Sequence, residues 1–145
     1  MTRIGGPNLD MLWTIHTIGG SKVMTEIDTG TQDLLATLDE GVAILTLNRP
    51  QARNAMSGEM NAALQTMLAD FEINPEVKAV VLTGAGKGFC AGGDVKGMAR
   101  SGDGTVGQNT IDGAIHQQRI HQRGTAGKLF KMPKPTLAAL PGAAA

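Results

Sequence analysis

Hydrophobic positions in the first third of the chain fall into two short runs separated by a turn. The runs are Leu34–Leu38 and Val42–Leu47, and Gly41 stands just before the second. Short apolar runs bounded by turn residues favour β-strands, and Gly41 gives the turn at residues 39–41 the backbone freedom that a hairpin needs. The pattern predicts a hairpin whose second strand ends by Pro50, because proline cannot donate to a strand ladder.

The longest segment with helical periodicity follows Ser57. Apolar side chains recur there at intervals typical of one helix face: Met60, Ala63, Leu64, Met67, Leu68 and Phe71. This spacing predicts an amphipathic helix with one buried stripe. Ser57 is a favourable N-cap, and Glu59 suits the positive end of the helix dipole. Pro75 ends the helix.

A strand and a glycine-rich loop come next. The strand is predicted at Ala79–Leu82, which gives the order β-β-α-β, and five of the ten residues from Gly84 to Gly93 are glycines. Asp94 then stands at the predicted start of a short helix. Free N–H groups at a helix start, beside a backbone without side chains, favour an anion or a developing oxyanion. The segment therefore predicts a backbone donor site.

The last third of the chain predicts three further elements. They are a polar surface loop at residues 101–107, a helix at residues 110–122 whose continuation Gly124 weakens, and a buried strand at Thr136–Leu140. A glycine turn and three alanines follow the strand. A buried strand without visible cover leaves a bare sheet edge, which favours a truncated N-terminal part of a larger domain. A complete small domain with a frayed tail is the alternative.

Composition indicates a globular chain without a nucleic-acid or membrane partner. Its 145 residues are 41% hydrophobic, 18% charged and 3% aromatic, with 13 basic and 13 acidic side chains. The equal numbers of basic and acidic side chains give no net charge that would attract nucleic acid or an anionic membrane. The low aromatic content leaves few rings on which bases could stack. No apolar run approaches the ~18 residues that span a bilayer. Cys90 is the single cysteine, which indicates a reducing compartment and hence a cytoplasmic location.

Residues 1–23 are predicted to be an extension outside the domain, which then begins at Met24. The segment contains glycine pairs and one apolar patch, but neither the long apolar core nor the cleavage site of a signal peptide is clear. A loosely docked N-terminal arm is the alternative.

Other kinds of site are less favoured. The glycines between residues 84 and 88 have the spacing G-x-G-x-G rather than the dinucleotide fingerprint, and Lys87 lacks the Ser or Thr of a Walker A loop. Cys90 has no His or Asn in a recognisable frame, so a small buried thiol is favoured over a nucleophile. His116 and His121 share a helix face poorly, so no metal site is predicted.

Three motifs occur in order: residues 47–50 (LNRP) with 53–56 (RNAM), residues 89–95 (FCAGGDV), and residues 134–142 (KPTLAALPG). With them the chain resembles the crotonase superfamily, the enoyl-CoA hydratase/isomerase family, from about Leu34 to Ala145. The resemblance implies an α/β fold, a spiral of ββα units, of which residues 24–145 would form the incomplete N-terminal part. It also implies trimers or dimers of trimers for the full-length protein.

The resemblance implies a site for an acyl-CoA substrate, with coenzyme A as part of the substrate and no separate cofactor. The backbone N–H of Gly93 would be one of two oxyanion-hole donors, and Arg53 could also contact a phosphate. The residues expected to hold CoA are Ala52, Arg53, Asn54, Ala91, Gly92, Asp94 and Val95. Asp94 could also cap the helix behind the donor.

The implied activity is that of an enoyl-CoA hydratase/isomerase-like lyase. Moving a proton next to a thioester carbonyl places negative charge on its oxygen, and losing one fixed N–H donor typically costs ~2.7–4 kcal/mol of barrier. The second donor and the family's glutamate acid/base residues would follow Ala145, so no general acid or base is assigned and the chain alone is expected to lack half of the site. A non-catalytic acyl-CoA-binding or assembly module and a nicotinamide or flavin oxidoreductase are the alternatives.

Overall fold

The computed structural model describes residues 13–14, 24–94 and 111–145. The strands are β1 (Trp13–Thr14), β2 (Thr25–Ile27), β3 (Leu34–Asp39), β4 (Val42–Leu47), β5 (Ala79–Gly84) and β6 (Thr136–Ala139). The helices are the short 3-10 helix η2 (Pro50–Ala52), α1 (Gly58–Ile73), α3 (Ile111–Gly124) and α4 (Ala126–Lys131). The predicted loop at residues 101–107 lies outside the described residues.

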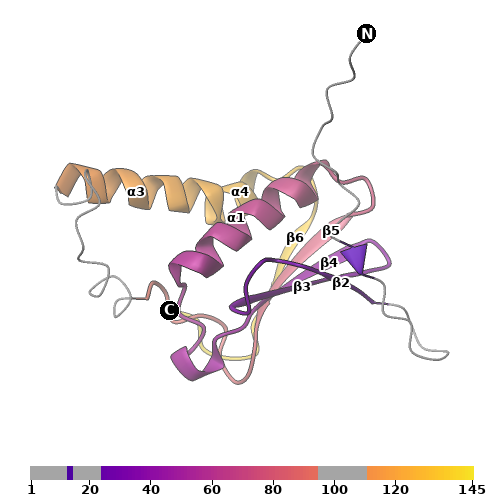
Figure 1. Ribbon diagram of the computed structural model, residues 1–145, viewed down its shortest axis with the longest axis horizontal. Helices are drawn as coiled ribbons and strands as arrows, with labels where there is room; N and C mark the ends of the chain where they lie inside the picture. The colour runs from indigo at the N-terminus through magenta and orange to yellow at the C-terminus, as the bar shows by residue number, and fades with distance from the viewer. Residues whose placement is uncertain (1–12, 15–23, 95–110) are drawn as a thin grey trace, which may run out of the picture.

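The strands form one sheet in which each strand pairs with the next along the chain. β1 to β4 are antiparallel, whereas β4, β5 and β6 are parallel to one another. Parallel neighbours need a crossover connection, which α1 provides between β4 and β5 and the α3–α4 pair provides between β5 and β6. Figure 1 shows α1 above the sheet with α4 and the adjoining end of α3 beside it, whereas the rest of α3 extends past the sheet. The predicted order β-β-α-β is confirmed.

The predicted hairpin forms with a two-residue turn. β3 and β4 pair from Leu34 opposite Leu47 to Asp39 opposite Val42. Glu40 (φ 49°) and Gly41 (φ 88°) are both left-handed, as a type I′ turn requires. Asp39, which the sequence places in the turn, belongs to β3.

The predicted stripe of α1 is confirmed. All six of its apolar side chains are buried, and the Ser57 hydroxyl accepts a hydrogen bond from the Met60 N–H at 3.1 Å. At the other end, the Lys134 ammonium donates to the carbonyls of Phe71 and Asn74 and so supplies partners for the last carbonyls of the helix. The stripe packs against alternate residues of the sheet to form the core: Leu34, Ala36, Ala43, Leu45, Leu47 and Val80.

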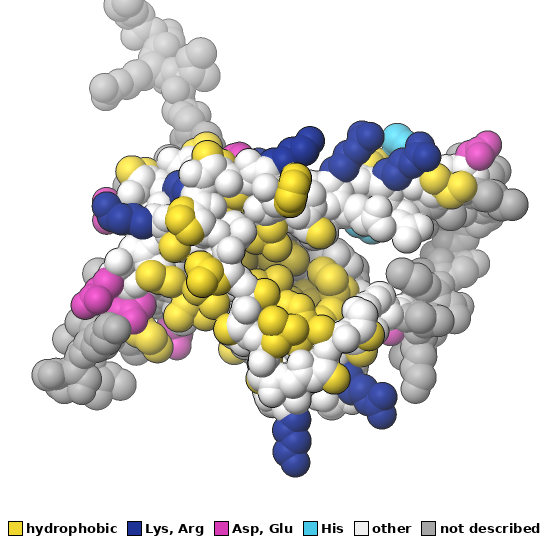
Figure 2. Space-filling view, turned by 180° about the vertical axis from the view of Figure 1, so that it is seen from behind, with side chains coloured by type: hydrophobic (Ala, Val, Ile, Leu, Met, Phe, Trp, Pro, Cys, Tyr) yellow, Lys and Arg dark blue, Asp and Glu magenta, His cyan; other side chains and the backbone are white. Residues whose placement is uncertain are grey.

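The last third differs from the sequence expectation at two points. Helical structure continues through α4, past the predicted end of the helix. β6 forms where a strand is predicted, but all four of its residues are exposed rather than buried. β6 is an edge strand of the described sheet and pairs only with β5 within it. Hydrophobic side chains also gather around a central hollow on the face seen in Figure 2.

The ends of the described chain also pair with other segments. Trp13 and Thr14 pair with Ile27 and Glu26 of β2, and the rest of residues 1–23 lies outside the described residues, so the proposed extension stays a prediction. After β6, the predicted turn leads into a short parallel pairing of Ala144 with Cys90.

Candidate functional site

The loop after β4 has an unusual backbone. Arg53 (φ 52°) and Asn54 (φ 55°) are both left-handed, a conformation that is uncommon for side chains other than Asn and Asp. Pro50 begins the helix η2, and the N–H of Arg53 donates to its carbonyl at 3.1 Å. The loop therefore turns sharply and carries Arg53 to the surface of the pocket described below.

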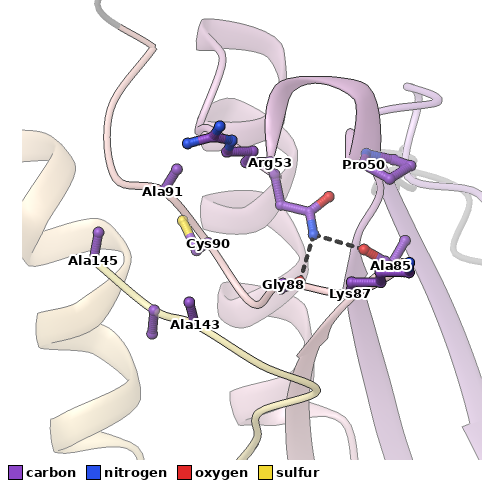
Figure 3. Close-up of a pocket in the computed structure, with 11 residues that line it drawn as sticks. Pro50, Arg53, Ala85, Lys87, Gly88, Cys90, Ala91, Ala143 and Ala145 are labelled. Atoms are coloured by element: carbon purple, nitrogen blue, oxygen red, sulfur yellow. Dashed lines mark hydrogen bonds between the residues drawn. The ribbon is translucent and has the colours of Figure 1, made fainter.

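Asn54 ties this loop to the glycine turn after β5 through two hydrogen bonds, which Figure 3 draws as the dashed lines that end at Ala85 and Gly88. Its side chain is buried, with a residue exposure of 1%. The Nδ2 group donates to the carbonyls of Ala85 and Gly88, both at 2.9 Å, and Oδ1 accepts from the Arg49 N–H at 2.8 Å. The amide is thus used within the fold, and a contact of Asn54 with CoA stays a prediction.

The glycine turn is tight because backbone atoms replace side chains. A Cβ built on Gly84 would lie 2.4 Å from the Phe89 carbonyl oxygen and 2.6 Å from that of Gly88. Gly86 is left-handed with φ 75°. Glycine is therefore required at Gly84 for space and favoured at Gly86 for conformation.

Residues 89–94 run between two other backbone segments. On one side the Phe89 N–H donates to the Ala143 carbonyl, and on the other the Ala91 N–H donates to the Arg53 carbonyl at 3.0 Å. A pocket of about 370 Å³ lies at this junction. Its lining residues are Pro50, Arg53, Asn54, Ala85, Lys87, Gly88, Cys90, Ala91, Ala143, Ala144 and Ala145.

The pocket includes some of the predicted site residues and not others. Arg53, Asn54 and Ala91 line it, whereas Ala52, Gly92, Gly93 and Asp94 do not, and Val95 lies outside the described residues. Figure 3 shows Arg53 and Lys87 on separate segments around it.

Eight of the eleven lining residues were not proposed as CoA contacts from the sequence, and Lys87 and Cys90 are the two of these with a charged or thiol side chain. In the sequence, Lys87 is one charged residue of the glycine-rich loop and Cys90 is a small thiol. Neither has a local pattern that indicates a place in the pocket lining. Cys90 is half-buried, packs against the core and lines the pocket.

The Gly93 amide, two residues after Ala91, has no hydrogen-bond acceptor among the described residues. Gly93 bridges with Met56, whose N–H donates to the Gly92 carbonyl at 2.9 Å and whose carbonyl accepts from Asp94 at 3.3 Å. In such a parallel bridge the central residue's own N–H points away from the paired strand. No described residue accepts a hydrogen bond from the Gly93 N–H.

Gly92 produces this orientation. The N–H of Ala91 and the carbonyl of Gly92 both face residues 53–56, whereas in a regular strand consecutive residues face opposite sides. Gly92 has φ 83°, and this left-handed residue breaks the alternation. As a result, the Gly93 N–H faces the side opposite to that of Ala91.

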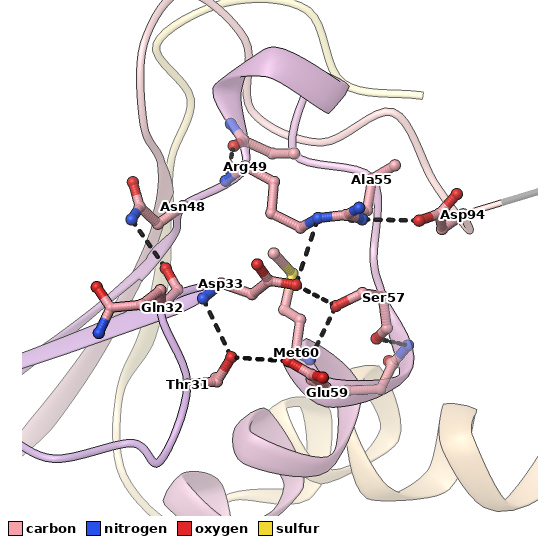
Figure 4. Close-up of polar contacts among 12 residues, drawn as sticks. Thr31, Gln32, Asp33, Asn48, Arg49, Ala55, Ser57, Glu59, Met60 and Asp94 are labelled. Carbon is pink, nitrogen blue, oxygen red and sulfur yellow. Dashed lines mark hydrogen bonds and ion pairs between the residues drawn. The ribbon is translucent and has the colours of Figure 1, made fainter. Parts of the chain in front are cut away.

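A polar network centred on Arg49 lies beside this segment (Figure 4). Arg49 Nη1 lies 2.9 Å from Asp94 Oδ2 and donates to the Ala55 carbonyl at 2.7 Å. Arg49 Nε lies 3.3 Å from Asp33 Oδ2, which also accepts from the Ser57 hydroxyl at 2.5 Å. The Asp94 carboxylate therefore pairs with Arg49, and the helix it is expected to cap lies outside the described residues.

Two further features bear on function. Within residues 13–14, 24–94 and 111–145, no group of three or more His, Cys, Asp and Glu side chains could hold a metal ion. No helix of the described chain is long and apolar enough to cross a bilayer.

Comparison with known proteins decides the family. The sequence model of the family described as enoyl-CoA hydratase/isomerase matches residues 42–144. The chain belongs to this family. The resemblance stated from the three motifs is thereby confirmed.

Relatives in the enoyl-CoA hydratase/isomerase family are longer than this chain. YngF, a Bacillus subtilis protein whose name places it among enoyl-CoA hydratases and isomerases, is 38% identical over 116 residues, which are 79% of this chain and 41% of YngF. The 1,2-epoxyphenylacetyl-CoA isomerase of Escherichia coli is 35% identical over 77% of this chain and 41% of its own length. The chain thus spans about two fifths of these relatives.

Solved structures of the enoyl-CoA hydratase/isomerase family share the fold. An enoyl-CoA hydratase/isomerase from Xanthobacter autotrophicus Py2 superposes with a TM-score of 0.65 at 31% identity, over 74% of this chain and 38% of that one. An enoyl-CoA hydratase from Bacillus anthracis superposes with a TM-score of 0.63 at 26% identity, over 77% of this chain and 40% of that one. The predicted α/β, crotonase-like fold is therefore confirmed, and the chain spans about two fifths of these structures.

Proposed function

We propose that this chain is part of an acyl-CoA thioester enzyme of the enoyl-CoA hydratase/isomerase type. Its Gly93 N–H would donate to the thioester carbonyl as that oxygen becomes negative. Family membership supports an acyl-CoA substrate, and the relative from Escherichia coli is named as an isomerase of a CoA thioester.

The observation that carries the proposal is the unused Gly93 amide, since no described residue accepts its hydrogen bond. A preorganised backbone N–H stabilises developing charge because it needs no reorientation during the reaction. Gly93 adds no side chain that would crowd the thioester. The reaction needs no separate cofactor, because CoA arrives as part of the substrate.

The pocket beside this amide would hold part of the CoA moiety. Arg53 and Lys87 provide positive charge at its lining, and the alanines at residues 143–145 provide a narrow apolar wall. A cation and a small apolar surface suit a ligand with phosphates at one end and an alkyl arm at the other. Arg53, Asn54 and Ala91 are the members of the proposed CoA-binding set that line this pocket. Ala52, Gly92, Asp94 and Val95 stay in the proposed set from the resemblance.

Calorimetric titration of the 145-residue chain with acetyl-CoA tests the binding part. Saturable binding that Gly93→Val weakens at least tenfold, and Gly93→Ala leaves within about threefold, supports the proposal; tenfold is about 1.4 kcal/mol. Alanine keeps the N–H and is small, whereas the branched valine side chain would meet the acyl group. Saturable binding of NAD or FAD with none of acetyl-CoA would instead favour the oxidoreductase alternative.

Hydration of crotonyl-CoA, followed by loss of the enoyl absorbance, tests the catalytic part. Turnover that Gly93→Val abolishes identifies an enzyme of the lyase type. Turnover by the 145-residue chain alone would exclude both the binding-module alternative and the expectation that this chain lacks half of the site. Binding without turnover by the full-length protein would support the alternative of an acyl-CoA-binding or assembly fragment. A trimer or hexamer of the full-length protein and a cytoplasmic location remain proposals from the resemblance, and sedimentation of the full-length protein tests the first.

A further inference from the structure

The donor amide lies between Gly92 and Gly93, so neither residue beside it has a side chain that could hold it in place. Two consecutive glycines can adopt many backbone conformations, so an amide between them is ordered only by what holds the flanking residues. Backbone pairing with Met56 provides one anchor, but its Asp94–Met56 hydrogen bond is long, at 3.3 Å. The first side chain after the glycines that can hold the segment is that of Asp94.

Arg49 holds Asp94 in a partly buried setting. Their side chains are 18% and 20% exposed, and Arg49 Nη1 lies 2.9 Å from Asp94 Oδ2. A charge-assisted hydrogen bond that is largely shielded from water is stronger than an exposed ion pair. The contact joins residues 45 positions apart in the sequence, so it connects the end of β4 to the donor segment.

Arg49 is itself fixed from two other directions. The Asp33 carboxylate lies 3.3 Å from Nε, and the Ala55 carbonyl accepts from Nη1 at 2.7 Å. The planar guanidinium fork can meet these groups and Asp94 at once, whereas a lysine ammonium is a single point on a flexible stem. Asp33 is bonded in turn to Ser57, the N-cap of α1.

We propose that Arg49 is a positioning residue, which holds the Gly93 N–H toward the substrate carbonyl through its ion pair with Asp94. This inference rests on the proposed function, in which Gly93 is the donor. Arg49 acts through Asp94 and touches no reacting atom. Its role is to keep the amide in one orientation before the substrate arrives.

Nitrogen-15 relaxation of the full 145-residue chain tests the ordering directly. The Gly93 order parameter is expected to be about 0.85 in the parent chain and to fall below about 0.6 in Asp94→Asn and Arg49→Lys. Asp94→Glu keeps a carboxylate and should restore most of the order. Glu72→Gln breaks the distant Glu72–Lys128 ion pair and serves as the matched control, with no change at Gly93. An unchanged Gly93 order parameter in folded Asp94→Asn overturns the inference.

A pair of ligands tests whether the ordered Gly93 N–H donates to the thioester carbonyl of the substrate. Acetyl-CoA carries the thioester oxygen, and S-ethyl-CoA lacks it but keeps the CoA moiety. One net hydrogen bond gives acetyl-CoA an advantage of about fivefold over S-ethyl-CoA. Arg49→Lys should reduce this advantage to about one while S-ethyl-CoA affinity stays constant. An advantage that persists in Arg49→Lys overturns the inference. Equal affinities in the parent chain overturn the proposed function instead, and the order parameter then still decides whether Arg49 orders Gly93.

Discussion

At the scale of single residues, a left-handed glycine determines where the donor amide points. Gly92 has φ 83°, and a Cβ at this position would meet no atom within 4 Å. Lack of space is therefore not what favours glycine at this position. The left-handed backbone conformation favours it, because a left-handed φ costs other residues roughly 1–2 kcal/mol.

We expect Gly92→Ala to lower the free energy of unfolding by about 1 kcal/mol and to weaken acetyl-CoA binding. Relief of the strain would turn the Gly93 amide from its present direction. Chemical denaturation and calorimetry measure the two effects. Gly58→Ala is the control, since Gly58 has open space and lies in the first turn of α1. A fully stable Gly92→Ala chain with parental binding would contradict this account.

Asn54 connects two loops that are far apart in the sequence. We expect Asn54→Ala to lower the free energy of unfolding by about 3 kcal/mol, because it leaves the Ala85 and Gly88 carbonyls and the Arg49 N–H without their partner. Asn54→Asp keeps the size and the acceptor but loses the donor, so it should cost nearly as much. Urea denaturation compares the three chains, and a loss under about 0.5 kcal/mol in both variants would contradict the structural role.

At the scale of elements, the β3–β4 hairpin carries strain in its turn. Glu40 is left-handed with φ 49°, and Asn is favoured at this position of a type I′ turn before Gly41. We expect Glu40→Asn to raise the free energy of unfolding by about 0.5–1 kcal/mol. Gly41→Ala should do the opposite, since Gly41 has φ 88° and Lys78 Cγ lies 3.1 Å from an added Cβ. Thermal melts measure both, and changes of the same sign would contradict the prediction.

The elements differ in how far local sequence determines them. The α1 stripe and the hairpin follow from side-chain spacing and turn residues, so the sequence predicts both. Arg49 appears in the sequence only as part of a motif, because its pairing with Asp94 spans 45 positions. The hydrogen bonds of Asn54 span 31 and 34 positions. Contacts of this range depend on how β4 and β5 lie side by side, which no local pattern encodes.

At the scale of the whole molecule, burial depends on what covers an element. The apolar sequence of β6 predicts a buried strand, yet Leu137 is 56% exposed and the nearby Leu140 is 55% exposed. Phe130 of α4 is 89% exposed. Strand formation follows from sequence and pairing with β5, whereas burial would need a layer that the described residues do not provide.

This exposed edge predicts that the 145-residue chain self-associates. An edge strand offers unpaired backbone groups, and exposed apolar side chains beside it favour contact with another copy. Leu137→Lys places a charge on the edge and should lower the self-association measured by sedimentation velocity at micromolar concentration. Gln118→Lys adds the same charge to the exposed surface of α3 and should have little effect. If both variants sediment like the parent chain, the contact lies elsewhere, because a lysine on the interacting strand would bury its charge without a partner.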